Sequence, residues 1–196
     1  DVEILDWHEI NRTPEKVKEA LVEKKPDVIG FSVLHGNRWG AGEIARTAKR
    51  LNPKVKTVFG GVGATFLWEH LLTLFPEVDC VVLGEGEWTF LNLVGHFEKR
   101  QDKGLARIKG IAYRENGKIL KTAEPEPVKD LDSLPIPAKH FTYPHVSSSR
   151  GCAWNCSFCG SPEFWGRNIR WRSPENFLEE VEMLFRKGVT FFYFSD

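Results

Sequence analysis

Three cysteines, Cys152, Cys156 and Cys159, follow one another with the spacing C-x3-C-x2-C. Thiolates this close in sequence can ligate one iron–sulfur cube only if the chain loops around it, and Gly151 and Gly160 permit such a loop. Cubane clusters normally take four cysteine ligands. Three ligands leave one iron open, and an open metal position indicates catalysis rather than scaffolding. The spacing therefore predicts a catalytic [4Fe–4S] cluster.

A zinc site or a redox-active disulfide is the alternative interpretation of these cysteines. Zinc sites usually combine two pairs of ligands, and no second pair is evident in the sequence. The fourth cysteine, Cys80, lies in an apolar run, which predicts a buried core thiol. The cluster remains the favoured interpretation.

The cysteine spacing, with Phe158 directly before the third cysteine, resembles the signature of the radical S-adenosylmethionine (SAM) enzymes. The resemblance implies that the open iron binds the amino and carboxylate groups of SAM. It implies that the reduced cluster cleaves SAM to a 5′-deoxyadenosyl radical, and that an external donor such as flavodoxin or ferredoxin supplies the electron. It also places Phe158 and Asp196 beside SAM, although Asp196 could equally cap a helix. We interpret Arg170 and Arg172 as solvated loop charges.

Strand and helix patterns alternate over the first half of the chain. Apolar runs predict strands at 2–7, 28–34, 55–59 and 78–83, and amphipathic spacing predicts helices after Thr13-Pro14, around 44–51, over 67–75 and over 90–97. Repeated strand–helix units indicate an α/β fold with a doubly wound, Rossmann-like parallel sheet.

Small residues gather where the predicted strands end, which is where such sheets bind ligands. They are Ser32, Gly60, Gly61, Gly84 and Gly86. Glycine lets a backbone approach a large ligand closely, but glycine turns at strand ends are also commonly structural. This feature alone leaves both roles open.

Three segments resemble the cobalamin-binding domain that precedes many radical enzymes. They are Gly30-Phe31-Ser32, Phe59-Gly60-Gly61-Val62-Gly63-Ala64-Thr65 and Gly84-Glu85-Gly86-Glu87-Trp88-Thr89-Phe90. The resemblance implies that seven of these residues line a slot for the nucleotide tail of cobalamin. They are Ser32, Gly60, Gly61, Thr65, Gly84, Glu85 and Gly86. Gly63 departs from the family, because many relatives carry a histidine there, so a tail contact at this position is in doubt.

The same comparison makes 2–7 the second strand of the cobalamin domain. We therefore expect a fragment that lacks the first strand, stops inside the radical domain and does not turn over substrate alone. His8 nearly matches a D-x-H-x-x-G cobalt-ligand pattern, but it follows the wrong strand and the glycine is absent, so we do not expect it to bind cobalt.

The chain is predicted to contain three parts. Residues 1–104 form the cobalamin-binding-like domain, and 105–145 form a β-hairpin and a proline-rich linker. Residues 146–196 begin the partial (β/α) barrel of a radical SAM domain, with a strand at 146–149, a helix from Ser173-Pro174 and a strand at 189–194. The core face of that helix is assigned to Phe177, Leu178, Val181, Leu184 and Phe185.

The amino-acid composition limits the classes of partner that can be expected. Lys plus Arg and Asp plus Glu both number 27, so no bulk charge indicates nucleic acid or an anionic membrane. No apolar run reaches the length of a membrane span, no signal peptide is evident, and the cysteine pattern does not suggest a disulfide framework. We expect a cytoplasmic enzyme that acts on a small molecule.

The order of the two domains resembles the cobalamin-dependent radical SAM enzymes, most of which methylate unactivated carbon or phosphorus. Methylation is therefore the leading functional prediction. A radical cyclase or ring-rearrangement enzyme of the same family is the first alternative. A corrinoid-binding carrier or sensor with a structural cluster is the second. Methylthiolation is disfavoured, because those relatives carry extra cysteines in the first domain, where only Cys80 is present.

Overall fold

The computed structural model describes residues 2–5, 13–99 and 104–195. The chain divides into two compact units, residues 1–126 and 127–196. The division falls inside the predicted connector 105–145. None of the helices in the described ranges is long and apolar enough to cross a membrane.

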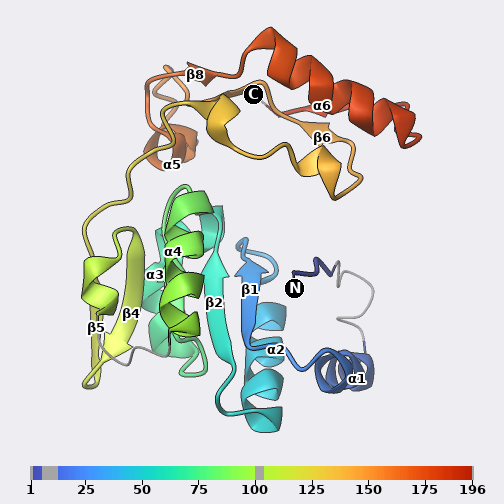
Figure 1. Ribbon diagram of the computed structural model, residues 1–196. Coiled ribbons are helices and arrows are strands. Elements are labelled where there is room, and N and C mark those ends of the chain that lie inside the picture. The colour runs from blue at the N-terminus through green and yellow to red at the C-terminus, as the bar shows by residue number, and fades with distance from the viewer. Residues whose placement is uncertain (1, 6–12, 100–103, 196) are drawn as a thin grey trace. The chain divides into compact units, whose positions relative to one another are not determined.

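A five-stranded sheet in the order β1-β2-β3-β4-β5 forms the centre of the first unit (Figure 1). Strands β1 (Val28–Ser32), β2 (Lys56–Gly60) and β3 (Cys80–Val82) are parallel. Strands β4 (Ile111–Glu115) and β5 (Lys118–Lys121) form an antiparallel hairpin, and β4 pairs antiparallel with β3. The carboxyl ends of β1, β2 and β3 therefore lie at the same edge of the sheet.

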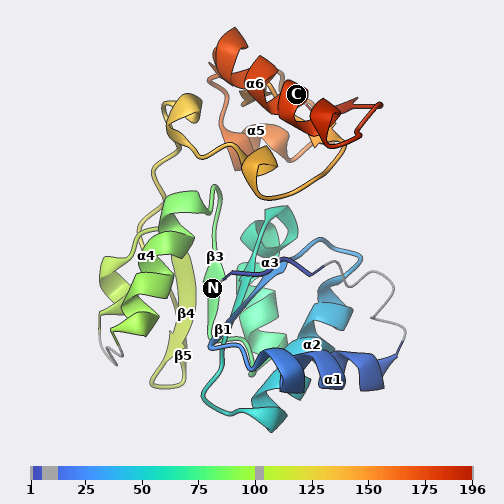
Figure 2. The same ribbon diagram turned by 45° about the vertical axis from the view of Figure 1, so that its right-hand side comes forward.

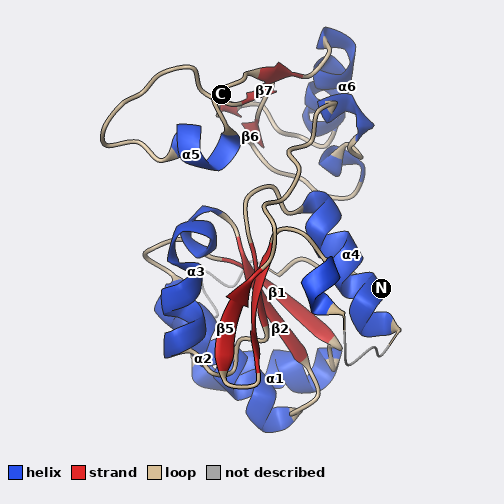
Figure 3. Ribbon diagram, turned by 90° about the vertical axis from the view of Figure 1, so that its left-hand side faces the viewer, coloured by secondary structure: helices blue, strands red, loops and turns tan. Residues whose placement is uncertain are grey.

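Helices cover both faces of this sheet (Figure 3). Helices α2 (Arg38–Leu51) and α3 (Val62–Leu74) bury their apolar residues against one face, in a core that contains Phe59 and Val81. Helix α4 (Glu87–Glu98) packs Leu93 against Val58 and Val82 on the opposite face. Helix α1 (Pro14–Lys24) packs beside α2. The predicted α/β, doubly wound fold is confirmed.

Two predictions about the sheet were wrong. The hairpin predicted as part of the connector instead extends the sheet, which is consequently mixed rather than wholly parallel. Pairing with β4 satisfies the backbone groups along the free edge of β3. Residues 2–5, predicted as part of a strand, are not assigned to one, and their side chains are exposed. An apolar run forms a strand only where a neighbour completes its hydrogen bonds.

Helix α3 begins five residues before its predicted start at Leu67. Gly61 adopts a positive φ of 89°, which turns the chain directly from β2 into the helix. The backbone N–H of Thr65 donates to the Gly61 carbonyl at 2.9 Å and closes the first turn. The prediction missed this start because a short loop was assumed after the two glycines.

The described part of the second unit contains two pairs of short strands, two α-helices and two single-turn 3₁₀-helices. The two α-helices, α5 and α6, are labelled in Figure 2. Strand β6 (His145–Val146) pairs in parallel with β9 (Tyr193–Phe194), and β7 (Ser149–Arg150) pairs antiparallel with β8 (Arg170–Trp171). Helix α5 (Ser161–Trp165) lies in the cysteine segment. Helix α6 (Pro174–Arg186) connects β8 to β9, so the predicted β-α-β start is confirmed with shorter strands.

Helix α6 starts as predicted, because the Ser173 hydroxyl accepts a hydrogen bond from the Asn176 N–H at 3.2 Å. Leu184 is fully buried, and Phe177 and Val181 pack against the same core. Leu178 and Phe185 were predicted to be buried, but their side chains are 56% and 63% exposed. These two residues are seven positions apart and share one stripe of the helix, which the small sheet does not cover.

Candidate cofactor sites

Ser32 and Gly60 lie opposite each other at the carboxyl ends of β1 and β2. The backbone N–H of Val33 donates to the Gly60 carbonyl at 2.8 Å, which holds the two strand ends together. A Cβ placed on Gly61 would lie 3.5 Å from the Ser32 Oγ. Ser32 is exposed, and its hydroxyl forms no hydrogen bond within the described part of the chain. The sheet edge thus presents an available hydroxyl beside bare backbone, which suits close approach by a large ligand.

The Thr65 hydroxyl, unlike that of Ser32, forms hydrogen bonds within the protein. Its hydroxyl donates to the Gly61 carbonyl at 2.9 Å and accepts from the backbone N–H of Gly84, also at 2.9 Å. Gly84 has a φ of +61° in the turn after β3. One side chain therefore joins the turn after β2 to the turn after β3.

The turn after β3 is more enclosed. Glu85 is only 7% exposed, and Gly86 precedes the first residue of α4. A Cβ on Gly86 would lie 3.3 Å from Val82 Cγ1, so this glycine is also needed for packing. The structure therefore brings all seven predicted residues to one edge of the sheet, with Ser32, Gly60 and Gly61 more open than Glu85.

Asn37 is a residue that the sequence reasoning missed. Its side-chain oxygen accepts from the Leu34 N–H at 2.7 Å, and its amide donates to the Ser32 carbonyl at 3.0 Å. These bonds brace the loop after β1 and fix the backbone of Ser32. The signal was the Gly36-Asn37 pair after a strand, since asparagine commonly bonds nearby backbone in turns.

Gly63 has no space for a side chain. A Cβ at this position would lie 2.7 Å from the Val33 carbonyl oxygen and 2.8 Å from the Leu34 Cα. The first turn of α3 therefore lies directly against the loop after β1. A histidine at this position would require the backbone to move.

Exposed apolar side chains surround the same edge, because the helices that follow parallel strands begin there. Trp39 lies in the first turn of α2, Val62 and Phe66 in α3, and Trp88 in α4. Isolated exposed apolar residues are ordinary, but four at one edge indicate an interaction surface. This rim was not predicted from the sequence.

The cysteine segment lies between β7 and β8, so the antiparallel pair holds both of its ends. The Cys152 N–H donates to the Gly166 carbonyl at 3.0 Å. Gly151 has a φ of +114°, and a Cβ there would lie 2.4 Å from the Asn168 carbonyl oxygen. The base of the loop is closed by contacts that only glycine permits at position 151.

The three thiols are free, and those of Cys156 and Cys159 belong to exposed residues. Hydrogen bonds from the Ser161 side chain and backbone lower the pKa of Cys159, which favours the thiolate that binds metal. Across the described ranges, no three His, Cys, Asp or Glu side chains are close enough together to hold a metal ion. The donor set fits an iron–sulfur cluster in number and chemistry, and ligation would gather the thiols. Phe158, beside them, is 90% exposed.

Arg170 and Arg172 are not solvated loop charges, contrary to the prediction. Arg170 donates to the Val128 carbonyl at 2.6 Å and to the Trp165 carbonyl at 3.0 Å. Arg172 pairs with Glu180, which is 3% exposed, and also donates to the Ser147 carbonyl at 3.2 Å. Both guanidinium groups reach backbone carbonyls beside the cysteine loop, because a planar group with five donors can bind several acceptors at once.

Three further predictions have different outcomes. Cys80 is buried as predicted, and burial raises the pKa of its thiol to about 12. His8 and Asp196 lie outside the residues that the structure describes.

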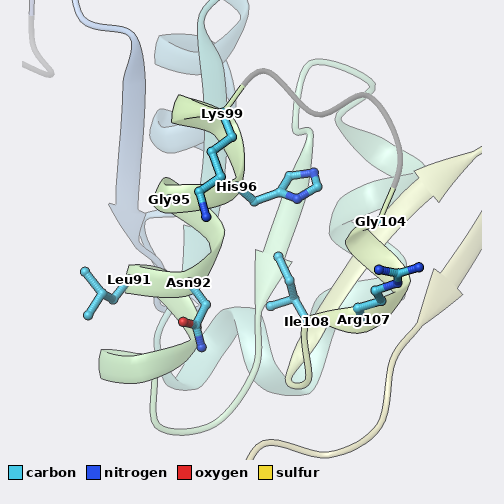
Figure 4. Close-up of a pocket in the computed structure, with 8 residues that line it drawn as sticks. All are labelled: Leu91, Asn92, Gly95, His96, Lys99, Gly104, Arg107 and Ile108. Carbon is cyan, nitrogen blue, oxygen red and sulfur yellow. The ribbon is translucent and has the colours of Figure 1, made fainter.

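A separate pocket of about 300 Å³ lies beside the carboxyl-terminal half of α4 (Figure 4). Among the described residues, its lining includes His96, Lys99 and Arg107 and no acidic side chain. Basic side chains at the end of a helix complement the helix dipole, which accounts for His96 and Lys99. The predicted cofactor residues Gly84, Glu85 and Gly86 lie before the opposite end of α4.

Two family models match the chain in the predicted order. The B12 binding domain matches residues 1–94, and the Radical SAM superfamily matches residues 146–196.

Two curated proteins are similar over almost the whole chain. The anaerobic magnesium-protoporphyrin IX monomethyl ester cyclase of Rubrivivax gelatinosus is 32% identical over 215 residues, which cover 100% of this chain and 38% of that protein. An uncharacterized methyltransferase of Pyrococcus horikoshii is 33% identical over 196 residues, which cover 94% of this chain and 42% of that protein. The chain thus spans well under half the length of these relatives.

A solved structure shares the fold. It is TsrM, a radical SAM methyltransferase from Kitasatospora setae, with cobalamin and a [4Fe-4S] cluster bound. The TM-score is 0.81 at 18% identity, and the match covers 100% of this chain and 42% of that one.

Proposed function

Because the chain belongs to the cobalamin-binding radical SAM family, we propose that the protein acts in the methylation of an unactivated carbon or phosphorus centre of a small molecule. One observation carries the proposal. An open serine–glycine edge on a doubly wound sheet is followed, on the same chain, by a three-cysteine loop anchored between two paired strands. Each of these features suits one cofactor, and the reaction needs both.

The first unit would hold cobalamin at the carboxyl edge of its sheet. Ser32 offers an available hydroxyl, and Gly60 and Gly61 allow close backbone approach. Thr65 positions the turns that contain Gly61 and Gly84, because its hydroxyl bonds to both. The glycine turn Gly84, Glu85 and Gly86 forms the adjacent wall. The exposed rim of Trp39, Val62, Phe66 and Trp88 supplies apolar contact for a large macrocycle.

The second unit would hold the [4Fe–4S] cluster and SAM. Cys152, Cys156 and Cys159 are the proposed ligands, and Phe158 and Asp196 are proposed to lie beside SAM. When bound, the reduced cluster would supply the electron that cleaves a carbon–sulfur bond of SAM to give a 5′-deoxyadenosyl radical, and methylcobalamin would supply the methyl group. The contacts at Gly151 and Cys152 fix the base of the loop, and the lowered pKa of Cys159 favours its thiolate.

The electron donor and the cellular compartment are part of the same proposal. The cluster would receive its electron from an external carrier such as flavodoxin or ferredoxin. Its thiols would stay reduced in the cytoplasm, and the four free cysteines are consistent with that compartment.

Ring formation is the second candidate, and one observation favours it. The Rubrivivax gelatinosus relative that covers the whole of this chain is named a cyclase. Both activities would use the same two cofactor sites, so the described residues do not separate them.

The test is made on the full-length protein, because residues 1–196 alone are not expected to turn over. It is reconstituted anaerobically with iron, sulfide and hydroxocobalamin and then incubated with SAM and dithionite. Methylation predicts that cobalamin binds and becomes methylcobalamin, with S-adenosylhomocysteine as the other product. A cyclase predicts 5′-deoxyadenosine without methylcobalamin. Cobalamin binding with neither product would overturn the enzymatic proposal in favour of a carrier or sensor. The Cys156→Ala variant is the control, because it should lose every cluster-dependent product.

A further inference from the structure

Positive charge is concentrated in the cysteine segment. The whole chain balances 27 basic residues against 27 acidic ones. Between Arg150 and Arg172, however, there are four arginines and one acidic residue, Glu163. The segment that would surround the cluster is therefore basic in composition, although the charge of Arg172 is paired with Glu180 of α6.

A hollow of about 330 Å³ collects part of this charge on the surface of the second unit. It is lined by Pro127, Lys129, Trp165, Gly166, Arg167, Asn168 and Arg170. Three of these side chains are basic and none is acidic, and Lys129 and Arg167 are exposed. Arg170 joins the two sides of the hollow, because its guanidinium donates to the Val128 and Trp165 carbonyls.

The wall of this hollow is continuous with the cysteine loop. The Gly166 carbonyl accepts the hydrogen bond from Cys152 N–H at 3.0 Å. Arg167 donates from its guanidinium to the Asn155 side chain, which lies between Cys152 and Cys156. A partner bound at the hollow would therefore contact the backbone that carries the proposed cluster ligands.

We propose that this basic surface, formed by Lys129, Arg167 and Arg170 around the hollow, docks an acidic electron-carrier protein of the flavodoxin type. The inference rests on the proposed function, since a radical SAM cluster needs one electron before it can cleave SAM. The carrier loses one electron and the cluster gains it, and no bond or proton is transferred.

Exposure of the charges favours a protein over a small anion. Lys129 and Arg167 face solvent, so neither provides the buried, desolvated contact that a small anion needs for tight binding. Exposed charges of one sign instead act over a Debye length of about 10 Å at moderate salt, and they accelerate the encounter with an acidic protein. The expected complex is weak, salt-sensitive and fast to form.

The experiment compares two sources of electrons for the anaerobically reconstituted protein. Stopped-flow absorbance follows cluster reduction by photoreduced flavodoxin, and isothermal titration calorimetry measures flavodoxin binding. In Lys129→Glu/Arg167→Glu we expect the second-order reduction rate at low salt to fall about tenfold or more, with a matching loss of binding. Reduction by dithionite should be unchanged, because that small reductant does not need the docking surface.

Two variants serve as controls. Arg167→Lys keeps the charge and should retain most of the flavodoxin rate. Lys25→Glu/Lys54→Glu makes the same charge change at two exposed lysines of the first unit and should leave the rate unaltered.

The outcomes are distinguishable. An unchanged flavodoxin rate in the double variant overturns the inference, as does saturable binding of inorganic phosphate at the hollow with unaltered flavodoxin binding. Failure of dithionite to reduce the wild-type protein would instead count against the proposed cluster itself.

Discussion

The Thr65 hydroxyl oxygen lies 2.9 Å from the backbone nitrogen of Gly84 and accepts its hydrogen bond. The same hydroxyl donates to the Gly61 carbonyl. Two glycine turns that follow different strands are therefore held in register by one side chain from the first turn of α3. Because the turns are part of the proposed cobalamin edge, Thr65 is a positioning residue whose effect on the cofactor should pass through the backbone.

Thr65→Val should loosen both turns. The replacement keeps the shape of the side chain but removes the hydroxyl, which leaves the Gly84 N–H without its partner. We expect a loss of about 1 kcal/mol in the free energy of unfolding, together with weaker cobalamin binding. Urea denaturation and a spectrophotometric cobalamin titration measure the two effects. Thr65→Ser, which keeps the hydroxyl, should restore both, and equal effects of valine and serine would refute the positioning role.

Ser32→Ala should separate cofactor binding from stability. The Ser32 hydroxyl is exposed and makes no hydrogen bond to any described residue, so its removal should change the free energy of unfolding by less than about 0.5 kcal/mol. Cobalamin affinity should nevertheless fall, because the available hydroxyl at the open edge is lost. The same titration and denaturation series provide the readouts. Unaltered affinity would remove Ser32 from the proposed site.

Gly63→Ala should destabilise the first unit. Its new Cβ would lie 2.7 Å from the Val33 carbonyl oxygen and 2.8 Å from the Leu34 Cα, and both of these neighbours are backbone atoms that cannot turn aside. We expect a cost of about 1–3 kcal/mol in urea denaturation. Gly95→Ala is the matched control, because Gly95 lies inside α4 with nothing within 4 Å of a Cβ. That control should stabilise by about 0.5–1 kcal/mol, and equal behaviour of the two variants would contradict the steric account.

The sequence predicted the parts of the fold that depend on local pattern. The pairs Thr13-Pro14 and Ser173-Pro174 marked the starts of α1 and α6, because a proline in the first turn acts locally. Ser173 caps its helix with a side-chain hydrogen bond, whereas Thr13, also predicted as a cap, makes none. The alternation of apolar strands with amphipathic helices predicted both covered faces of the sheet. The position of the β4–β5 hairpin beside β3 was missed, since its pairing partner lies some 30 residues away in sequence.

The candidate sites, like the fold, were predicted where local motifs determine them and missed where tertiary packing does. The cysteine spacing and the glycine turns were readable as motifs, but the motif did not distinguish Ser32, which is available, from Thr65, which is used internally. Arg172 was misjudged because its partner Glu180 comes from the next helix and the contact depends on tertiary packing. Side-chain roles of this kind follow from the fold, and no single residue signals them.

The cluster prediction is tested by removing each cysteine in turn. Cys152→Ala, Cys156→Ala or Cys159→Ala should abolish the [4Fe–4S] cluster, because each removes one of only three proposed ligands. Iron analysis after anaerobic reconstitution should give about four irons per wild-type chain. Cys80→Ala should keep the full iron content, since that thiol is buried in the first unit. A Cys156→Ala protein that retained its cluster would contradict the assignment of the three cysteines as its ligands.

The final prediction concerns the buried pair of Arg172 and Glu180. Arg172 bonds to Glu180, to the Asn176 side chain at 2.7 Å and to the Ser147 carbonyl. Glu180 also accepts from the Tyr143 hydroxyl, and burial together with this carboxylate raises the pKa of Tyr143. The pair thus connects α6 to the strands on either side of the cysteine loop.

Arg172→Met should therefore affect both stability and the cluster. Glu180 would remain buried without its cation, at a cost of about 3–5 kcal/mol in the free energy of unfolding. The strand ends beside the loop would lose the hydrogen bonds that connect them to α6. Iron content after reconstitution should therefore fall, although all three cysteines remain. Arg172→Met/Glu180→Leu removes both charges and should recover most of the stability. If the double variant also regains its iron, the main role of Arg172 is to neutralise the buried Glu180. If iron stays low while stability returns, the Arg172 bond to Ser147 is what positions the loop.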